Sequence, residues 1–122
     1  MFCYFLLMKN KKQYINGRRL KSALNYINRN LQNNISVKAL SREAFMSEPS
    51  FFRCFKLQFG ITPVEYIIRQ RIKVAKMMLR AADVPISEIS YSSGFNNMSY
   101  FLRTFKRRTG LTPSQYRKSI FA

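Results

Sequence analysis

A stretch of sixteen residues near the end of this chain repeats a stretch that lies fifty residues earlier. Residues 51–66 read FFRCFKLQFGITPVEY and residues 101–116 read FLRTFKRRTGLTPSQY, with Phe, Arg, Phe, Lys, Gly, Thr, Pro and Tyr shared at matching positions. Unrelated segments of this length would match at about one position, given the usual abundance of each residue type. We therefore expect the chain to contain two copies of one small structural unit.

Both copies carry the same signals for ending one helix and starting the next. Gly60 and Gly110 suit the left-handed position that follows a helix, because glycine adopts that conformation without steric penalty. Thr62 and Thr112 then open the segments TPVE and TPSQ, which have the form of a capping box with proline at the first helical position. The repeated unit is therefore a short helix, a tight turn, a longer helix, a glycine and a capped helix.

Apolar residues at helical spacing and short connections predict an all-α fold of seven helices, with two helix-turn-helix units joined by a long central helix. A central helix of about twenty residues would span about 30 Å, close to the separation of about 34 Å between successive major grooves. The predicted segments are an apolar and basic leader expected to be poorly ordered (1–16), the first helix-turn-helix unit (17–61), the central linker helix (62–82) and the second helix-turn-helix unit (83–122).

The charge balance points to a polyanionic partner. The chain has 22 Lys and Arg against 5 acidic residues, a net charge of +17. A folded body this basic is relieved of self-repulsion by nucleic acid or, less readily, by an anionic membrane. The absence of His, the scattered acids and the two distant cysteines, Cys3 and Cys54, leave no catalytic relay and no metal-ligand spacing. We expect no enzyme activity, no metal and no cofactor.

The longer helix of each copy has a core face and an outward face. Phe51 and Phe55 are four residues apart and point inward, whereas Phe52, Arg53 and Lys56 lie on the outward side. Arginine can bind the major-groove edge of guanine, lysine more often contacts phosphate, and an apolar side chain can contact a thymine methyl. The second copy repeats the outward face with Ser99, Leu102, Arg103, Lys106 and Arg107. This recurrence favours a DNA-reading surface over an ordinary solvated one.

The segments MSEPSFFRCFKLQFGITPVEYI, RIKVAKMML and ISEISYSSGFNNMSYFLRTFKRRTGLTPSQYRK resemble the DNA-binding domain of AraC/XylS-type bacterial transcription regulators, over about residues 20–118. The resemblance implies recognition helices at about 48–58 and 98–108, which enter successive major grooves. The positions implied to contact bases are Pro49, Phe52, Arg53, Met98, Ser99 and Arg103. The positions expected to contact phosphate are Ser47, Lys56, Asn97, Lys106, Arg107 and Arg108.

The resemblance also implies partners and a location. The expected partners are double-stranded promoter DNA and RNA polymerase, since most members of the family are activators, and the expected location is the bacterial cytoplasm at the nucleoid. No membrane partner is expected, and the chain would act as a monomer or as a dimer through an N-terminal or missing segment. One departure concerns Phe45, which stands where the second unit has Gly94, a turn position that often needs a positive φ. We therefore expect the first turn to differ in shape.

Two other classes of protein remain open at this point. A basic architectural or RNA-binding protein without sequence preference would show the same net charge. A membrane-active amphipathic protein would use the cations of the central helix, which are Arg69, Arg71, Lys73, Lys76 and Arg80.

Overall fold

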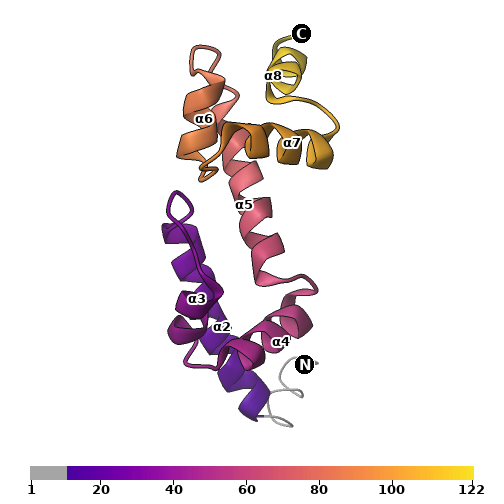
Figure 1. The fold of residues 1–122 in the computed structure, drawn as a ribbon. Coiled ribbons are helices and arrows are strands. Elements are labelled where there is room, and N and C mark those ends of the chain that lie inside the picture. The colour runs from indigo at the N-terminus through magenta and orange to yellow at the C-terminus, as the bar shows by residue number, and fades with distance from the viewer. Residues whose placement is uncertain (1–10) are drawn as a thin grey trace. The chain divides into compact units, whose positions relative to one another are not determined.

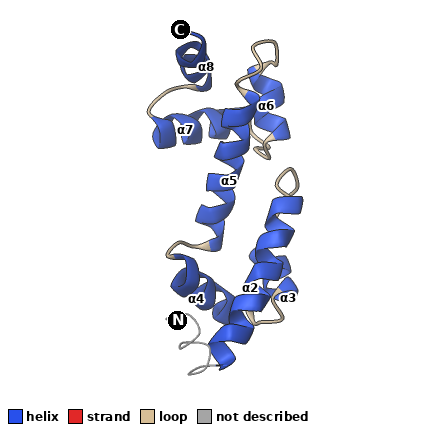
Figure 2. Ribbon diagram, turned by 180° about the vertical axis from the view of Figure 1, so that it is seen from behind, coloured by secondary structure: helices blue, strands red, loops and turns tan. Residues whose placement is uncertain are grey.

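The computed structural model describes the backbone of residues 11–122 and the side chains of residues 17–122. Over that range the chain forms seven helices and no strand, which confirms the predicted all-α class (Figures 1 and 2). The helices are α2 (Lys11–Arg29), α3 (Val37–Glu43), α4 (Glu48–Phe59), α5 (Pro63–Met78), α6 (Ile86–Ser92), α7 (Met98–Thr109) and α8 (Pro113–Phe121).

The described chain divides into two compact units, each of which contains one copy of the repeat motif. The first unit comprises residues 11–30 and 35–66 and includes the pair α3 and α4. The second comprises residues 31–34 and 67–122 and includes the pair α6 and α7. The division between Tyr66 and Ile67 lies inside α5, within the segment 62–82 that was predicted as the central linker helix.

Two helix boundaries differ from those expected. The first helix begins at Lys11 and includes Gly17, so part of the predicted leader is helical; residues 1–10 of that leader lie outside the described residues. The helix α5 has 16 residues, a length of about 24 Å, and ends at Met78. The amides of Arg80 and Ala81 bond to carbonyls only three residues back, at 3.3 and 3.1 Å, so the chain tightens before it reaches Pro85.

Each unit is built around the aromatic residues of its repeat copy. The rings of Phe51 and Phe55 lie 5.6 Å apart, and Tyr66 meets Phe55 edge-on at 5.9 Å. In the second unit the corresponding distances are 5.8 Å between Phe101 and Phe105 and 5.5 Å between Phe105 and Tyr116. All four phenylalanines are fully buried. The shared aromatic letters of the repeat are therefore core residues, as their spacing predicted.

The predicted threonine caps and glycine helix ends are present. Thr62 accepts a hydrogen bond from the Glu65 amide at 3.1 Å, and both bonds of the capping box between Thr112 and Gln115 are formed. Gly60 and Gly110 follow their helices with φ of 77° and 84°. These local signals fix where each long helix of the repeat ends and where the next helix begins.

The two helix-turn-helix turns have the same hydrogen-bond pattern, so the prediction of a different first turn is wrong. Phe45 adopts a φ of 54°, and Gly94 adopts 101°. The amides of Phe45 and Met46 bond to carbonyls three and five residues back, at 3.0 and 2.9 Å, and those of Gly94 and Phe95 do the same at 3.1 and 2.9 Å. Phe45 bears the cost that a Cβ brings to the left-handed conformation, while the backbone hydrogen bonds of the turn hold it there and its side chain is 78% exposed.

Candidate nucleic-acid interface

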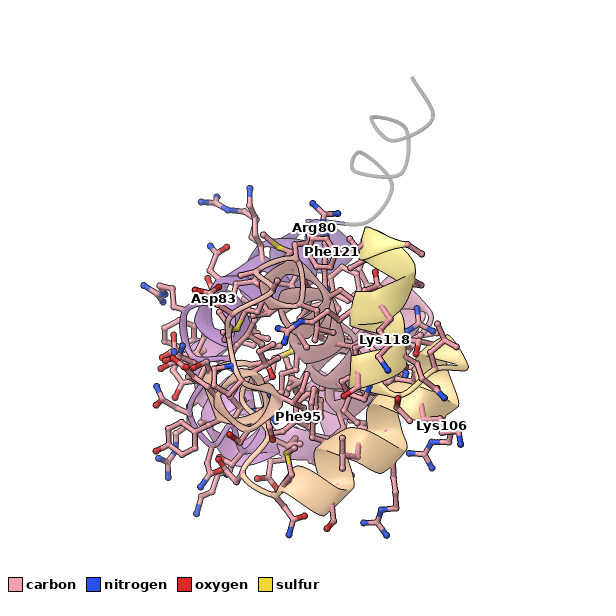
Figure 3. The ribbon with its side chains drawn as sticks, turned by 90° about the horizontal axis from the view of Figure 1, so that it is seen from above. Arg80, Asp83, Phe95, Lys106, Lys118 and Phe121 are labelled. Carbon is pink, nitrogen blue, oxygen red and sulfur yellow. The ribbon has the colours of Figure 1, made fainter. Side chains whose placement is uncertain are left out.

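The helix α7 presents a polar and basic stripe on the side opposite its core. At about 100° per residue, Arg103 lies about 200° and Lys106 about 140° around the helix from buried Phe101. Ser99 falls between these two directions, and all three side chains are exposed. Figure 3 shows Lys106 pointing outward from the second unit, while Phe95 lies within it. We call Ser99, Arg103 and Lys106 the α7 stripe.

The helix α4 presents a matching stripe in the first unit. Pro49, Arg53 and Lys56 have the same angular positions relative to buried Phe51 and are all exposed. We call these three residues the α4 stripe. Because each stripe is rigidly set by two buried phenylalanines on the other side of its helix, its arginine and lysine project from a fixed backbone. Sequence reasoning therefore placed both stripes correctly on the outward faces of their helices.

Apolar side chains flank the stripes. Phe52 is 43% exposed and Leu102, its counterpart, is 36% exposed, so both could reach a thymine methyl only with part of their surface. Met98, at the first position of α7, is 38% exposed. These three side chains are partly exposed at the edges of the stripes.

Two residues predicted to contact phosphate are also helix caps. The hydroxyl oxygen of Ser47 accepts a bond from the Ser50 amide at 3.3 Å, and the side-chain oxygen of Asn97 accepts one from the Tyr100 amide at 2.9 Å. Both side chains are exposed and keep a donor, the Ser47 hydroxyl hydrogen and the Asn97 amide. A phosphate contact from either residue is therefore compatible with its capping bond.

The two arginines that end α7 point in different directions. Arg107 lies about 120° from Phe101 and can flank the α7 stripe, whereas Arg108, seven residues after Phe101, returns to the core side. There it lines a surface cavity with Lys73 and Lys76 of α5. The structure thus separates Arg108 from the other residues that were predicted to contact phosphate.

Arg71 supports the second unit in a way that sequence reasoning missed. Its Nε donates to the Leu31 carbonyl at 3.0 Å and its terminal nitrogen donates to the Asn33 carbonyl at 2.9 Å. Partial burial lowers the pKa of the Arg71 guanidinium, and the Tyr100 hydroxyl opposes that shift. These partners lie 38 and 40 residues from Arg71 along the chain, so no local pattern could reveal them.

The loop held by Arg71 packs against the turn that leads into α7. A Cβ added to Gly94 would lie 2.0 Å from the Leu31 carbonyl oxygen and 2.7 Å from the Arg71 Nε. Two residues further on, the Asn96 amide donates to the Asn34 side chain at 2.8 Å. Gly94 is therefore needed for space as well as for its positive φ, and residues 31–34 adjoin the start of α7.

Other kinds of site find no support in the described residues. No group of three or more His, Cys, Asp or Glu side chains there could hold a metal ion. None of the helices described is both long and apolar enough to cross a bilayer.

Comparison with known proteins identifies the family. Residues 40–119 match the family model described as "Helix-turn-helix domain". The chain is 39% identical over 92 residues to the probable transcriptional regulator LumQ of Photobacterium leiognathi, covering 75% of this chain and 37% of that protein. It is 31% identical over 100 residues to the arabinose operon regulatory protein of Escherichia coli, covering 81% of this chain and 34% of that protein. The chain thus spans little more than a third of the length of these curated relatives.

Solved structures agree with this assignment. The DNA-binding domain of AdpA, solved in complex with a target DNA, aligns with a TM-score of 0.77 at 27% identity, over 82% of this chain and 90% of that one. The C-terminal domain of the response regulator yesN from Fusobacterium nucleatum aligns with a TM-score of 0.73 at 29% identity, over 78% and 93%. The chain belongs to the AraC-type helix-turn-helix family of DNA-binding transcriptional regulators.

Proposed function

We propose that this chain binds double-stranded DNA with sequence preference and that α4 and α7 each enter a major groove. The observation that carries the proposal is the duplicated stripe. In two separate helices an arginine lies two residues, and a lysine five residues, after a buried phenylalanine. Two such helices that share this outward chemistry are suited to read two half-sites. The relative solved with target DNA bound supports the same use of the fold.

Within this proposal the side chains divide into readers and clamps. Arg53 and Arg103 bind guanine edges in bidentate fashion, because the planar guanidinium matches the two acceptors of guanine. The remaining base contacts come from Pro49, Phe52, Met98 and Ser99. The phosphate contacts come from Ser47, Lys56, Asn97, Lys106 and Arg107. Phosphate contacts hold each helix in register, and base contacts supply the preference.

The two half-sites are proposed to lie in successive major grooves, with centres about 10–10.5 base pairs apart. Selection of binding sites from random duplex DNA at physiological salt tests this directly. The expected result is a bipartite motif with that spacing. A motif confined to one groove segment would contradict the use of two recognition helices.

A second candidate function, that of a basic protein which coats nucleic acid without sequence preference, follows from the net charge of +17. The two functions differ in the ratio of affinities for selected and scrambled duplexes at one fixed salt concentration. Sequence-specific regulators bind their sites about 10³- to 10⁷-fold more tightly than other DNA. Equal affinity for both duplexes would favour the coating function and refute sequence-specific binding.

The proposed biological role is regulation of transcription in a bacterial cytoplasm, at the nucleoid, without catalysis. RNA polymerase is the proposed protein partner and activation the proposed effect. Transcription in vitro with purified bacterial polymerase tests both, from one promoter that carries the selected site and one that carries a scrambled site. More transcript from the first template only is the expected result; equal or reduced transcript contradicts activation.

A further inference from the structure

The turn that leads into α7 is one residue longer than the turn that leads into α4. One residue, Met46, separates the residue with positive φ from the cap of α4, whereas two residues, Phe95 and Asn96, do so before α7. Met46 and Phe95 make the same backbone bond to a carbonyl five residues back, so Asn96 is the additional residue. Its side-chain amide donates to the Asn34 side chain at 2.8 Å. The additional residue therefore ties the turn to the loop between α2 and α3.

The loop that accepts this bond is itself fixed by Arg71 of α5. The Arg71 Nε donates to the Leu31 carbonyl at 3.0 Å, and a terminal nitrogen donates to the Asn33 carbonyl at 2.9 Å. Burial lowers the pKa of the Arg71 guanidinium and Tyr100 of α7 raises it, so the Tyr100 hydroxyl lies near this side chain. Residues 31–34, α7 and this part of α5 all belong to the second unit, and Arg71 connects them.

Packing continues these contacts into the recognition helix. The loop leaves no room for a Cβ at Gly94, which would lie 2.0 Å from the Leu31 carbonyl oxygen. The next residue, Phe95, is buried, and its ring lies 5.0 Å from that of Phe101 and 5.8 Å from that of Tyr100. A continuous series of contacts therefore joins Arg71 and the loop to the first turn of α7, where the proposed base contacts begin.

We propose that Arg71 and Asn34 are positioning residues for DNA reading, which hold the loop 31–34 against the turn and so fix the direction in which α7 presents Arg103. The inference rests on the proposed function and adds two residues that act through α7 rather than on DNA. A bidentate arginine contact requires a side chain held within about 0.5 Å and 10–20° of its productive geometry, whereas phosphate contacts carry no sequence information. The corresponding turn of the first unit is open to solvent, with Phe45 78% exposed, so reading by α4 should not depend on these residues.

The test measures how strongly each half-site is discriminated. Discrimination is the ratio of affinities for the selected duplex and for a duplex with one half-site scrambled, at one fixed salt concentration. The α7 half-site is the one at which Arg103→Ala loses discrimination. Arg71→Met keeps an apolar stem and removes both bonds to the loop, and Asn34→Ala removes one exposed bond. Gly110→Ala is the matched control, since it strains the other end of α7, where nothing lies within 4 Å of the added Cβ.

We expect discrimination at the α7 half-site to fall at least about fivefold in Arg71→Met, the lower end of what one bidentate pair contributes, and about twofold in Asn34→Ala. Discrimination at the α4 half-site should not change, and Gly110→Ala should keep both. Amide exchange confirms that the second unit is folded in each variant, and Asn34→Ala decides the matter if Arg71→Met does not fold.

Three results overturn the inference: unchanged discrimination at the α7 half-site, an equal fall at both half-sites, or the same fall in Gly110→Ala. A slope of log affinity against log salt that is lower by about one, with unchanged discrimination, would make Arg71 a phosphate contact and also overturns it. Failure of the proposed function is distinct, because the unaltered chain would then discriminate at neither half-site.

Discussion

Replacement of Gly94 by alanine tests whether the turn before α7 requires glycine for lack of space as well as for its positive φ. The added methyl group would lie 2.0 Å from the Leu31 carbonyl oxygen, which is backbone, and 2.7 Å from the Arg71 Nε. Neither separation is possible for real atoms, so residues 31–34 must shift away from the turn. That shift breaks the contact geometry in which Arg71 bonds to Leu31 at 3.0 Å and to Asn33 at 2.9 Å.

The expected loss of stability has two parts. Holding a residue with a side chain at a φ of 101° costs about 1–3 kcal/mol. Loss of one of the two hydrogen bonds from charged Arg71 adds about 1.5–3 kcal/mol. The substitution Gly94→Ala should therefore destabilise the second unit by about 2.5–6 kcal/mol, a large share of the 5–15 kcal/mol that is usual for a domain.

Gly110→Ala provides the matched control within the same unit. Gly110 has a φ of 84°, but nothing lies within 4 Å of the position its Cβ would occupy. This variant should therefore show only the conformational part, about 1–3 kcal/mol. Amide hydrogen exchange at Phe101 and Phe105, both fully buried, measures opening of the second unit in each variant.

The reasoning is refuted if the two glycine variants lose the same stability, within about 0.5 kcal/mol. Equal losses would mean that residues 31–34 move aside without cost. When Arg71 is already replaced by alanine, the substitution Gly94→Ala should cost less stability, because the guanidinium bonds are absent. An unchanged cost would show that the guanidinium bonds are not the interactions affected.

Five further substitutions test three other features. Phe45→Gly should stabilise the first unit by about 1 kcal/mol in urea unfolding, because it removes strain at a φ of 54°; a loss of stability would show that the exposed ring makes a favourable contact. Arg103→Ala should weaken binding to the best DNA site by about 1–3 kcal/mol and relax the preference at one base pair, whereas Lys106→Ala should weaken binding to all duplexes and lower the slope of log affinity against log salt by about one. Variants that behave alike would contradict the division into reader and clamp. Thr112→Ala should cost about 1 kcal/mol in thermal unfolding while Thr112→Ser costs much less, since either hydroxyl can cap α8; equal losses would exclude the cap as the cause.

The features predicted from the sequence are those that depend on a few neighbouring residues. The threonine and serine caps, the glycine ends and the inward phenylalanines all arise from spacings of two to four residues, which the sequence displays directly. The direction of Arg108, which differs from that of the α7 stripe, follows from the same helical geometry, since Arg108 is seven residues from Phe101. That any of the predicted site residues contacts DNA stays a prediction.

The features that the sequence did not predict depend on contacts between distant parts of the chain or on a balance between opposing local preferences. No local pattern links Arg71 to the loop that precedes α3, because the interaction joins residues about forty positions apart. The end of α5 at Met78 was placed too late because Leu79 continues the apolar spacing even though the backbone has already tightened. The shape of the first turn was misjudged because the steric penalty of Phe45 was weighed without the stabilising bonds that the turn makes.

The two halves of the duplicated interface should respond differently to the ionic content of the cell. Where α7 has Arg107 beside its stripe, α4 has Leu57, which is 80% exposed and carries no charge. Each phosphate contact made by a cation releases counterions, so a phosphate contact from Arg107 would make the proposed α7 half-site lose affinity faster as salt concentration rises. A rise in potassium concentration would then weaken binding at that half-site first, while binding at the α4 half-site would depend more on base composition and less on the electrolyte.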